Sequence, residues 1–352
     1  MKERIFWLDI VRCFAIILVV FTHVHENVYI ENKMLVSLFY SIDRIGVPLF
    51  FMLSGGLILP KIADIDILTF YKKRIPQFFI LIIVWSIMTN FSKAILVDNS
   101  SFKEAISTAI QYNGIYPGSY SSAAQMWFMY TIIELYLIAP FLARLLNKLS
   151  NYYIMIFISI CFILNQFKTD LVFFLEKLHI GGGESLQKFG SDFTGAYLIY
   201  FILGYLIIYR NFFSKKNYIT SVFMIFLPIM LNLCIDLILN DVIFIFHWYS
   251  TSIFIVISSI GMLILMRDLF KDSKQKNFVV NRFITLISIY SFGIYLSHYC
   301  FIFVGMKIIN FYSINAGNQY YLMFIYFIFS FIGGFTLTHL LMKNKYTKFF
   351  VA

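Results

Sequence analysis

The sequence predicts an all-α bundle of about ten transmembrane helices, a polytopic integral membrane protein with both termini in the cytoplasm. Its composition points to this class first. Of the 352 residues, 60% are hydrophobic and only 13% are charged, whereas a soluble domain carries about 25% charged residues. The hydrophobic residues also come in blocks, several of them long enough for the roughly 20 residues that a helix needs to cross a bilayer. The third observation is the distribution of basic residues between the blocks.

The hydrophobic blocks place the spans in order along the chain. The first begins at Ile5 and is interpreted as an uncleaved helix, because it is long and lacks the small-residue cleavage pattern of a signal peptide. No internal repeat divides the chain, so residues 1–352 are expected to form a single membrane domain. The expected spans are 5–25, 37–59, 75–97, 125–143, 152–167, 193–209, 218–237, 243–266, 283–305 and 320–342.

The net charge of +10 is explained by topology. With the N-terminus in the cytoplasm, 19 of the 28 Lys and Arg residues fall in cytoplasmic segments, seven fall outside, and two, Arg12 and Arg44, lie within helices. This is the positive-inside distribution of a membrane protein with an even number of spans. Membrane lipids are therefore expected partners, and nucleic acid is not.

Cysteine spacing and loop motifs exclude several kinds of site. The four cysteines have neither CxxC nor metal-type spacing, so they are interpreted as small apolar side chains within the spans. The sequence has no glycine-rich nucleotide loop, HExxH or EF-hand pattern. We therefore expect no metal site and no permanently bound cofactor.

The first span contains three ionisable residues, Asp9, Arg12 and His23. An ionisable group near the centre of a span costs about 2.5–3.5 kcal/mol on insertion scales, so it is retained with a partner or a wet cavity. Arg12 and His23 are eleven residues apart, which leaves them only about 20° apart around a helix axis, on one face. Asp9 precedes Arg12 by three residues and is expected to pair with it.

The second span combines a charge with residues that loosen the backbone. Arg44 is expected in its outer half. Pro48 and the run Ser54-Gly55-Gly56 permit a close helix approach or a cavity. For Ser54 and Gly55 a structural role and a ligand-binding role are equally open.

Two later spans each add an ionisable residue to the candidates. Glu134 falls near the middle of the fourth span and His298 in the ninth. Residues of this type within spans mark functional sites by default. His25 points to a different face from His23 and is expected to be an interfacial polar residue at the outer surface.

At these positions the chain resembles the acyltransferase-3 group of bacterial membrane-bound acyltransferases. That family has five features in order: a basic residue and a His separated by ten residues, an Arg followed by Phe-Phe and Ser-Gly, a basic cluster, Trp-Phe, and Ser-x-Gly-Ile-Tyr-x-x-His. The matching residues are Arg12 and His23; Arg44, Phe50-Phe51 and Ser54-Gly55; Lys72-Lys73-Arg74; Trp127-Phe128; and Ser291 to His298. Any one motif is weak, whereas five in register are specific.

Within the family the chain is most similar to the short, single-domain type represented by the O-acetyltransferase of enterobacterial common antigen. It departs from the family pattern in two places. Cys13 follows Arg12 where many relatives have glycine, and the cluster at 72–74 reads Lys-Lys-Arg where relatives have several Arg. The second difference changes the groups offered to phosphates.

The resemblance implies an enzyme of the bacterial cytoplasmic (inner) membrane. It would transfer an acyl group, usually acetyl, from acyl-coenzyme A to a hydroxyl of a surface polysaccharide or its lipid-linked precursor. Histidine suits the general base because its ordinary pKa is about 6.5, and arginine suits phosphates and oxyanions. The residues assigned to the reaction are His23, Arg12, Arg44 and Glu134, and those assigned to the donor are Lys72, Lys73, Arg74, Ser54 and Gly55.

Other interpretations stay open. A polysaccharide exporter or flippase would also need charged residues in a helical bundle, although no internal repeat supports one. A polymerase is disfavoured because no long external loop is expected. Topological anchoring is an alternative for residues 72–74, and a buried ion network is one for Arg12 with His23. The transferred group can be acetyl or succinyl.

Overall fold

A computed structural model describes residues 5–113, 121–189, 195–239, 252–271, 278–312 and 318–351. In these ranges the chain is helical and contains no strand. Nine of the described helical segments are long and apolar enough to cross a membrane. They match nine of the ten expected spans, which confirms the all-α polytopic fold class. The sixth expected span corresponds to the shorter apolar segment Leu198–Tyr209. Residues 193–194 and 243–251 of the expected spans lie outside the described ranges.

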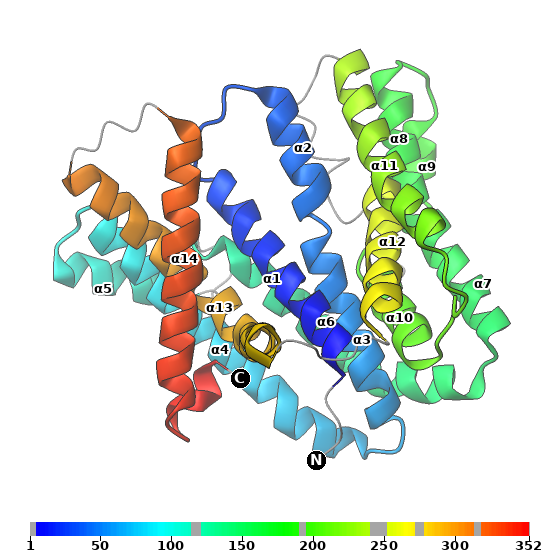
Figure 1. Ribbon diagram of the computed structural model, residues 1–352, viewed down its shortest axis with the longest axis horizontal. Helices are drawn as coiled ribbons and strands as arrows, with labels where there is room; N and C mark the ends of the chain where they lie inside the picture. Colours follow the sequence, from blue (N-terminus) through cyan, green and yellow to red (C-terminus); the bar gives the residue numbers. More distant parts are fainter. Residues whose placement is uncertain are drawn as a thin grey trace. The chain divides into compact units, whose positions relative to one another are not determined.

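The main helices follow the chain in order (Figure 1). They are α1 Phe6–His25, α2 Lys33–Asp43, α3 Gly46–Ile62, α4 Ile67–Leu96, α5 Phe102–Gln111, α6 Trp127–Lys148, α7 Asn151–Phe162, α8 Lys168–Lys177, α9 Gly183–Gln187, α10 Leu198–Gly204, α11 Tyr218–Leu239, α12 Ile253–Phe270, α13 Phe278–Phe311 and α14 Gln319–Met342. Short 3₁₀ turns occupy Ala124–Met126 and Thr347–Phe350, and π-helical turns occupy Ile163–Phe167 and Tyr205–Tyr209.

The helices gather into two compact units. One unit contains α1 up to Leu18, then α2, α3 and the chain from Ile138 to Phe278. The other contains Val19–Ile30, the segment Ile67–Leu137 and the chain from Val279 onward. Each unit is therefore assembled from segments far apart in the sequence.

The second span is two helices rather than one. α2 ends at Asp43, Arg44 forms its C-cap, and α3 starts at Gly46. Pro48 lies in the first turn of α3, where its missing N–H breaks no helical hydrogen bond. Arg44 is thus placed at a helix junction, and its guanidinium lies 4.8 Å from the centre of the Tyr40 ring. The expected loosening of this span occurs ahead of the proline.

In the first unit, α3 packs against α10 through glycine. A side-chain carbon on Gly55 would lie 1.8 Å from the carbonyl oxygen of Phe201, and one on Gly204 would lie 1.9 Å from that of Met52. Both distances are far below van der Waals contact, so the two backbones touch where only glycine fits. α11 and α12 also lie side by side in this unit (Figure 1).

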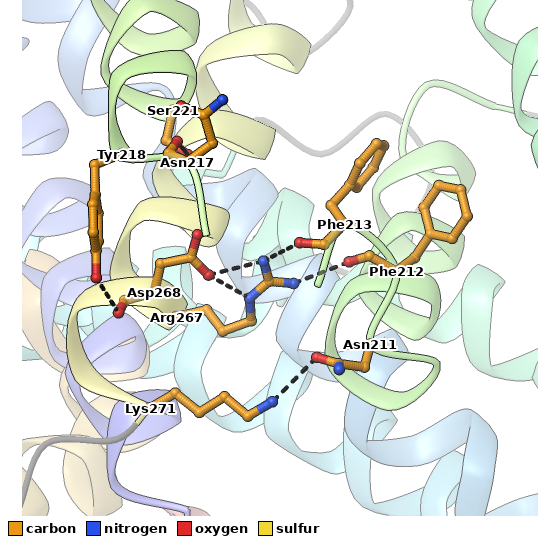
Figure 2. Close-up of polar contacts among 9 residues, drawn as sticks. All are labelled: Asn211, Phe212, Phe213, Asn217, Tyr218, Ser221, Arg267, Asp268 and Lys271. Carbon is orange, nitrogen blue, oxygen red and sulfur yellow. Dashed lines mark hydrogen bonds and ion pairs between the residues drawn. The ribbon is translucent and has the colours of Figure 1, made fainter. Parts of the chain in front are cut away.

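A buried arginine fastens the turn that follows α10 in the same unit. Arg267 is 2% exposed and donates from Nε to Oδ1 of Asp268, 2.9 Å away. Its Nη1 donates to the carbonyl oxygen of Phe212 at 2.9 Å, and its Nη2 donates to that of Phe213. Figure 2 shows the guanidinium reaching between the carboxylate and the two carbonyls. This arginine, expected only as a topological charge, therefore holds a turn together.

In the second unit, Asn90 of α4 bonds to residues between α5 and α6. Its amide nitrogen donates to the carbonyl oxygen of Tyr112 and to Oγ of Ser121, and its oxygen accepts from the backbone N–H of Ser122. The neighbouring α5 begins with a capping box in which Ser101 and Glu104 bond each other reciprocally. Hydrogen bonds from Ser101 lower the pKa of the Glu104 carboxyl.

Candidate active site

The end of α1 places His23 in the second unit, just ahead of a short turn. His23 lies in the last turn of the helix. Beyond it, the Asn27 side chain donates to the carbonyl oxygen of His23 at 2.7 Å, which caps a helix end that would otherwise lack a donor. This turn brings the carboxylate of Glu26 to the imidazole.

His23 is held by two polar partners. Its Nδ1 lies 2.8 Å from Oε2 of Glu26 and 3.2 Å from the hydroxyl of Tyr299 on α13. An ionised carboxylate can only accept, so a neutral His23 carries its proton on Nδ1 and keeps a lone pair on Nε2. With His23 only 8% exposed, the arrangement fixes both the orientation and the tautomer of the ring.

A second histidine lies directly against the first. The rings of His23 and His298 stack with their centroids 5.3 Å apart and an interplanar angle of 27°. Nδ1 of His298 lies 2.6 Å from the carbonyl oxygen of Tyr295 and must donate to it, because a carbonyl has no proton. His298 is fully buried. The two imidazoles therefore have different surroundings, one beside a carboxylate and one beside a carbonyl.

Two tyrosine rings lie against this pair, and one of them connects it to Gln125. The ring of Tyr299 lies 4.9 Å from His23 and 5.2 Å from His298, measured between centroids. The hydroxyl of Tyr295 donates to the backbone carbonyl of Gln125 at 2.6 Å, and the Gln125 side chain is itself buried. We call His23, Glu26, His298, Tyr299 and Gln125 the histidine cluster.

The structure pairs Asp9 with Arg12, as the spacing predicted. Oδ1 of Asp9 lies 3.6 Å from Nη1 of Arg12, with Asp9 buried and the Arg12 side chain 26% exposed. Both belong to the part of α1 that is in the first unit. Their pairing offsets much of the cost of two charges within a span.

The remaining first-unit candidates have evident structural surroundings. Arg44 packs over Tyr40 at the helix junction, and Ser54 is half-buried on α3. Gly55 is required by the contact with Phe201. The close approach to α10 accounts for a glycine at this position without any ligand.

The basic cluster lies on a helix rather than in a loop. α4 begins at Ile67, so Lys72, Lys73 and Arg74 occupy its second turn, and all three side chains are exposed. Consecutive helical residues are about 100° apart, so the three side chains spread over roughly 200° of the helix surface. They do not all face one ligand.

Two residues differ from expectation. The interfacial position predicted for His25 is wrong, because the residue is 2% exposed and its ring lies 5.4 Å from that of Phe21. Glu134, placed near the middle of the fourth span and assigned to the reaction, is exposed on α6. In the described part of the chain, the carboxylate that contacts His23 belongs to Glu26 instead.

Sequence reasoning did not select Glu26 or Tyr299. The signal for Glu26 was its distance of three residues from His23, which places two side chains within reach in a helix or a following turn. Tyr299 had a weaker signal, since it directly follows His298 in the sequence but reaches His23 across 276 positions. No group of three or more His, Cys, Asp or Glu side chains with metal-binding potential occurs in the described ranges.

Comparison with known proteins gives one match. The family model of the acyltransferase-3 type, described as an acyltransferase domain, matches residues 5–343. No curated protein and no solved structure matches. The match covers α1 to α14 and therefore includes every residue of the histidine cluster.

Proposed function

The chain belongs to the acyltransferase-3 family and is a polytopic membrane acyltransferase, and from this premise we propose that it acylates a surface glycan. The donor would be an acyl-coenzyme A, with acetyl the first candidate for the acyl group. The acceptor would be a hydroxyl of a surface polysaccharide or of its lipid-linked precursor. The observation that carries the proposal is the contact between His23 and Glu26. Family membership favours this reaction over glycan export.

The chemistry follows from the tautomer of His23. The Glu26 carboxylate accepts a hydrogen bond from Nδ1–H of His23, so the lone pair of Nε2 is available to take a proton from the acceptor hydroxyl. The hydroxyl oxygen attacks the thioester carbonyl carbon and forms the new C–O bond. The C–S bond then breaks, and the protonated His23 returns its proton to the leaving thiolate, which leaves as free coenzyme A. Glu26 stabilises the imidazolium formed between the two steps.

The roles of the arginines and the basic cluster remain proposals. Arg44 would stabilise the oxyanion that develops on the thioester, because a guanidinium stays charged and offers several donors. Arg12 would contact the donor between its phosphates and its acyl end. On the surface of α4, two adjacent members of Lys72, Lys73 and Arg74 would hold the nucleotide phosphates. Ser54 is the other residue proposed to contact the donor.

The location and subtype are proposed on the same basis. The basic end of α4 would face the cytoplasm, where acyl-coenzyme A is made, and the membrane would be the bacterial inner membrane; the positive-inside charge distribution supports this orientation. The proposed subtype is the one represented by the O-acetyltransferase of enterobacterial common antigen. Acetyl and succinyl transfer are distinguished by the mass that is added to the glycan.

The test compares the surface glycan of cells with the gene, without it, and with His23→Gln in its place. Mass spectrometry should show an acetyl-sized or succinyl-sized increment that disappears on deletion. His23→Gln keeps polarity and much of the side-chain volume but cannot act as a base at neutral pH, so it should reduce transfer by about 10²–10⁴-fold. Near-normal acylation with His23→Gln at equal protein level would remove His23 from the mechanism, and an unchanged glycan mass on deletion would overturn the proposed reaction.

A further inference from the structure

His298 has a buried hydrogen-bond acceptor that the described part of the chain leaves unused. Because Nδ1 donates to the carbonyl of Tyr295, the neutral ring has its lone pair on Nε2. His298 is fully buried, and Nε2 has no hydrogen-bond partner within the described ranges. A buried polar atom without a partner costs about 1–3 kcal/mol. Such an atom indicates a partner from outside the chain.

Gln125 presents a second unused acceptor in the same cluster. Its amide nitrogen faces Oγ1 of Thr89 at 3.2 Å and the carbonyl oxygen of Leu296 at 3.5 Å. The carbonyl can only accept, which assigns the nitrogen to this side of the amide. The amide oxygen is then directed elsewhere, and in the described structure it has no partner. Gln125 is as fully buried as His298.

Tyr295 joins the two acceptors. Its hydroxyl donates to the backbone of Gln125, and its own carbonyl accepts from His298. The two orphaned atoms therefore belong to side chains fixed on one scaffold, and one of these side chains, His298, lies against His23. Both atoms are acceptors, so their complement is a set of hydrogen-bond donors. An anion would be repelled by both lone pairs.

The surroundings favour a sugar as the ligand that supplies these hydrogen-bond donors. The rings of Tyr295 and Tyr299 flank His298 with centroids 6.2 and 5.2 Å away. A binding site that combines apolar ring faces with a few oriented polar atoms is typical for a small organic ligand. A sugar presents several O–H donors around a ring whose C–H faces are apolar, so it matches both features.

We propose that Nε2 of His298 and Oε1 of Gln125 accept hydrogen bonds from hydroxyls of the acceptor sugar that neighbour the hydroxyl being acylated. The inference rests on the proposed function and adds the acceptor subsite to it. The stacking of His298 on His23 places such a hydroxyl beside the general base. His298 itself stays neutral, since a second positive charge against a protonated His23 would be strongly unfavourable. It binds and orients the acceptor but takes no proton from it.

The experiment measures steady-state kinetics of the full-length enzyme in proteoliposomes. The acceptor is base-treated cell envelope from the deletion strain, which has lost its O-acyl groups, and the donor is radiolabelled acetyl- or succinyl-coenzyme A. His298→Phe keeps a flat ring but removes the acceptor atom, so it should raise the KM for envelope about tenfold. The KM for the donor should stay within about twofold. His298→Gln restores an acceptor oxygen and should recover most of the loss.

A control and a second variant separate the subsite from a packing role. His339→Gln changes a histidine of α14 that bonds Tyr290 in the same unit, and it should leave both KM values unchanged. Gln125→Met removes the other acceptor at similar volume and should also raise the KM for envelope, and the double variant with His298→Phe should raise it further than either single variant. If only a structural water bonds to these two acceptors, His298→Phe should leave the KM for envelope unchanged. That result would overturn the subsite but not the proposed function. A change confined to kcat or to the donor KM also overturns the subsite. Absence of transfer by the wild-type enzyme instead overturns the proposed function.

Discussion

Nδ1 of His23 lies 2.8 Å from Oε2 of Glu26, just beyond the C-terminal end of α1. The contact joins the last turn of a membrane span to the turn that follows it. It is the arrangement by which a carboxylate orients an imidazole for general base catalysis.

Glu26→Gln tests that orientation. An amide can accept from Nδ1 but cannot stabilise the imidazolium by charge, and its NH₂ group can favour the wrong tautomer. We expect kcat to fall by about 10–10³-fold with both KM values little changed. The measurement is steady-state transfer by the purified variant.

Lys33→Gln serves as a surface control for this substitution, because Lys33 is exposed at the start of α2. It should retain normal kcat. Full activity of Glu26→Gln would show that the carboxylate is a helix-end residue with no part in the reaction.

His25→Ala is predicted to affect stability rather than chemistry. The side chain is buried and packs on Phe21, so truncation leaves an unfilled space that costs about 1–3 kcal/mol. Thermal unfolding in detergent should shift to lower temperature, while kcat measured below that transition stays near the wild-type value. A loss of kcat as large as that of His23→Gln would place His25 in the reaction.

The contrast between the Asp9–Arg12 pair and the burial of His25 shows what the sequence could and could not predict. Hydropathy located nine of the ten spans and charge spacing paired Asp9 with Arg12, because these patterns depend on the solvent and on residues one turn apart. Burial of His25 depends on which other segments pack around the helix end. No pattern within α1 contains that information.

The hydropathy pattern also did not predict where individual helices begin and end. The junction at Arg44 interrupts the expected second span, and α4 extends into polar sequence as far back as Ile67. Both are decided by backbone hydrogen bonding rather than by hydrophobicity. The stacking of His298 on His23 was likewise unpredictable, since it joins helices from opposite ends of the chain.

Gly55→Ala tests the close packing of α3 on α10. The added carbon would lie 1.8 Å from a backbone oxygen of Phe201, and a backbone atom cannot move aside as a flexible side chain can. We expect a loss of at least about 2–3 kcal/mol of stability or a failure to accumulate folded protein. Size-exclusion profiles and thermal unfolding in detergent measure both.

The matched control is Gly181→Ala, because an added carbon there would meet no atom within 4 Å. This variant should be indistinguishable from wild type. Normal stability of Gly55→Ala would mean that the two helices are farther apart than described.

Arg267→Lys tests the clamp on the turn after α10. Lysine keeps the charge but cannot donate at once to Asp268 and to the carbonyls of Phe212 and Phe213, so buried acceptors lose their partners. Breaking a buried charged network costs about 3–5 kcal/mol. The unfolding temperature should fall clearly, whereas Lys271→Ala, at an exposed contact with Asn211, should have little effect. Equal stability of the two variants would refute the clamp.

Single neutralisation of Lys72, Lys73 and Arg74 distinguishes donor binding from topological anchoring. The three residues project from α4 in directions about 100° apart, so a bound donor can contact two neighbours but not all three. We expect two adjacent variants to raise the KM for acyl-coenzyme A about 5–50-fold and the third to behave as wild type, with the acceptor KM unchanged throughout.

Acyl-dephospho-coenzyme A, which lacks the ribose phosphate, should be used by the wild type as poorly as the normal donor is used by the affected variants. Lys103→Gln on α5, also exposed, controls for loss of a surface charge. Anchoring alone predicts equal and small effects for all three positions, because the positive-inside effect depends on the number of charges near the span and not on the direction in which each side chain points.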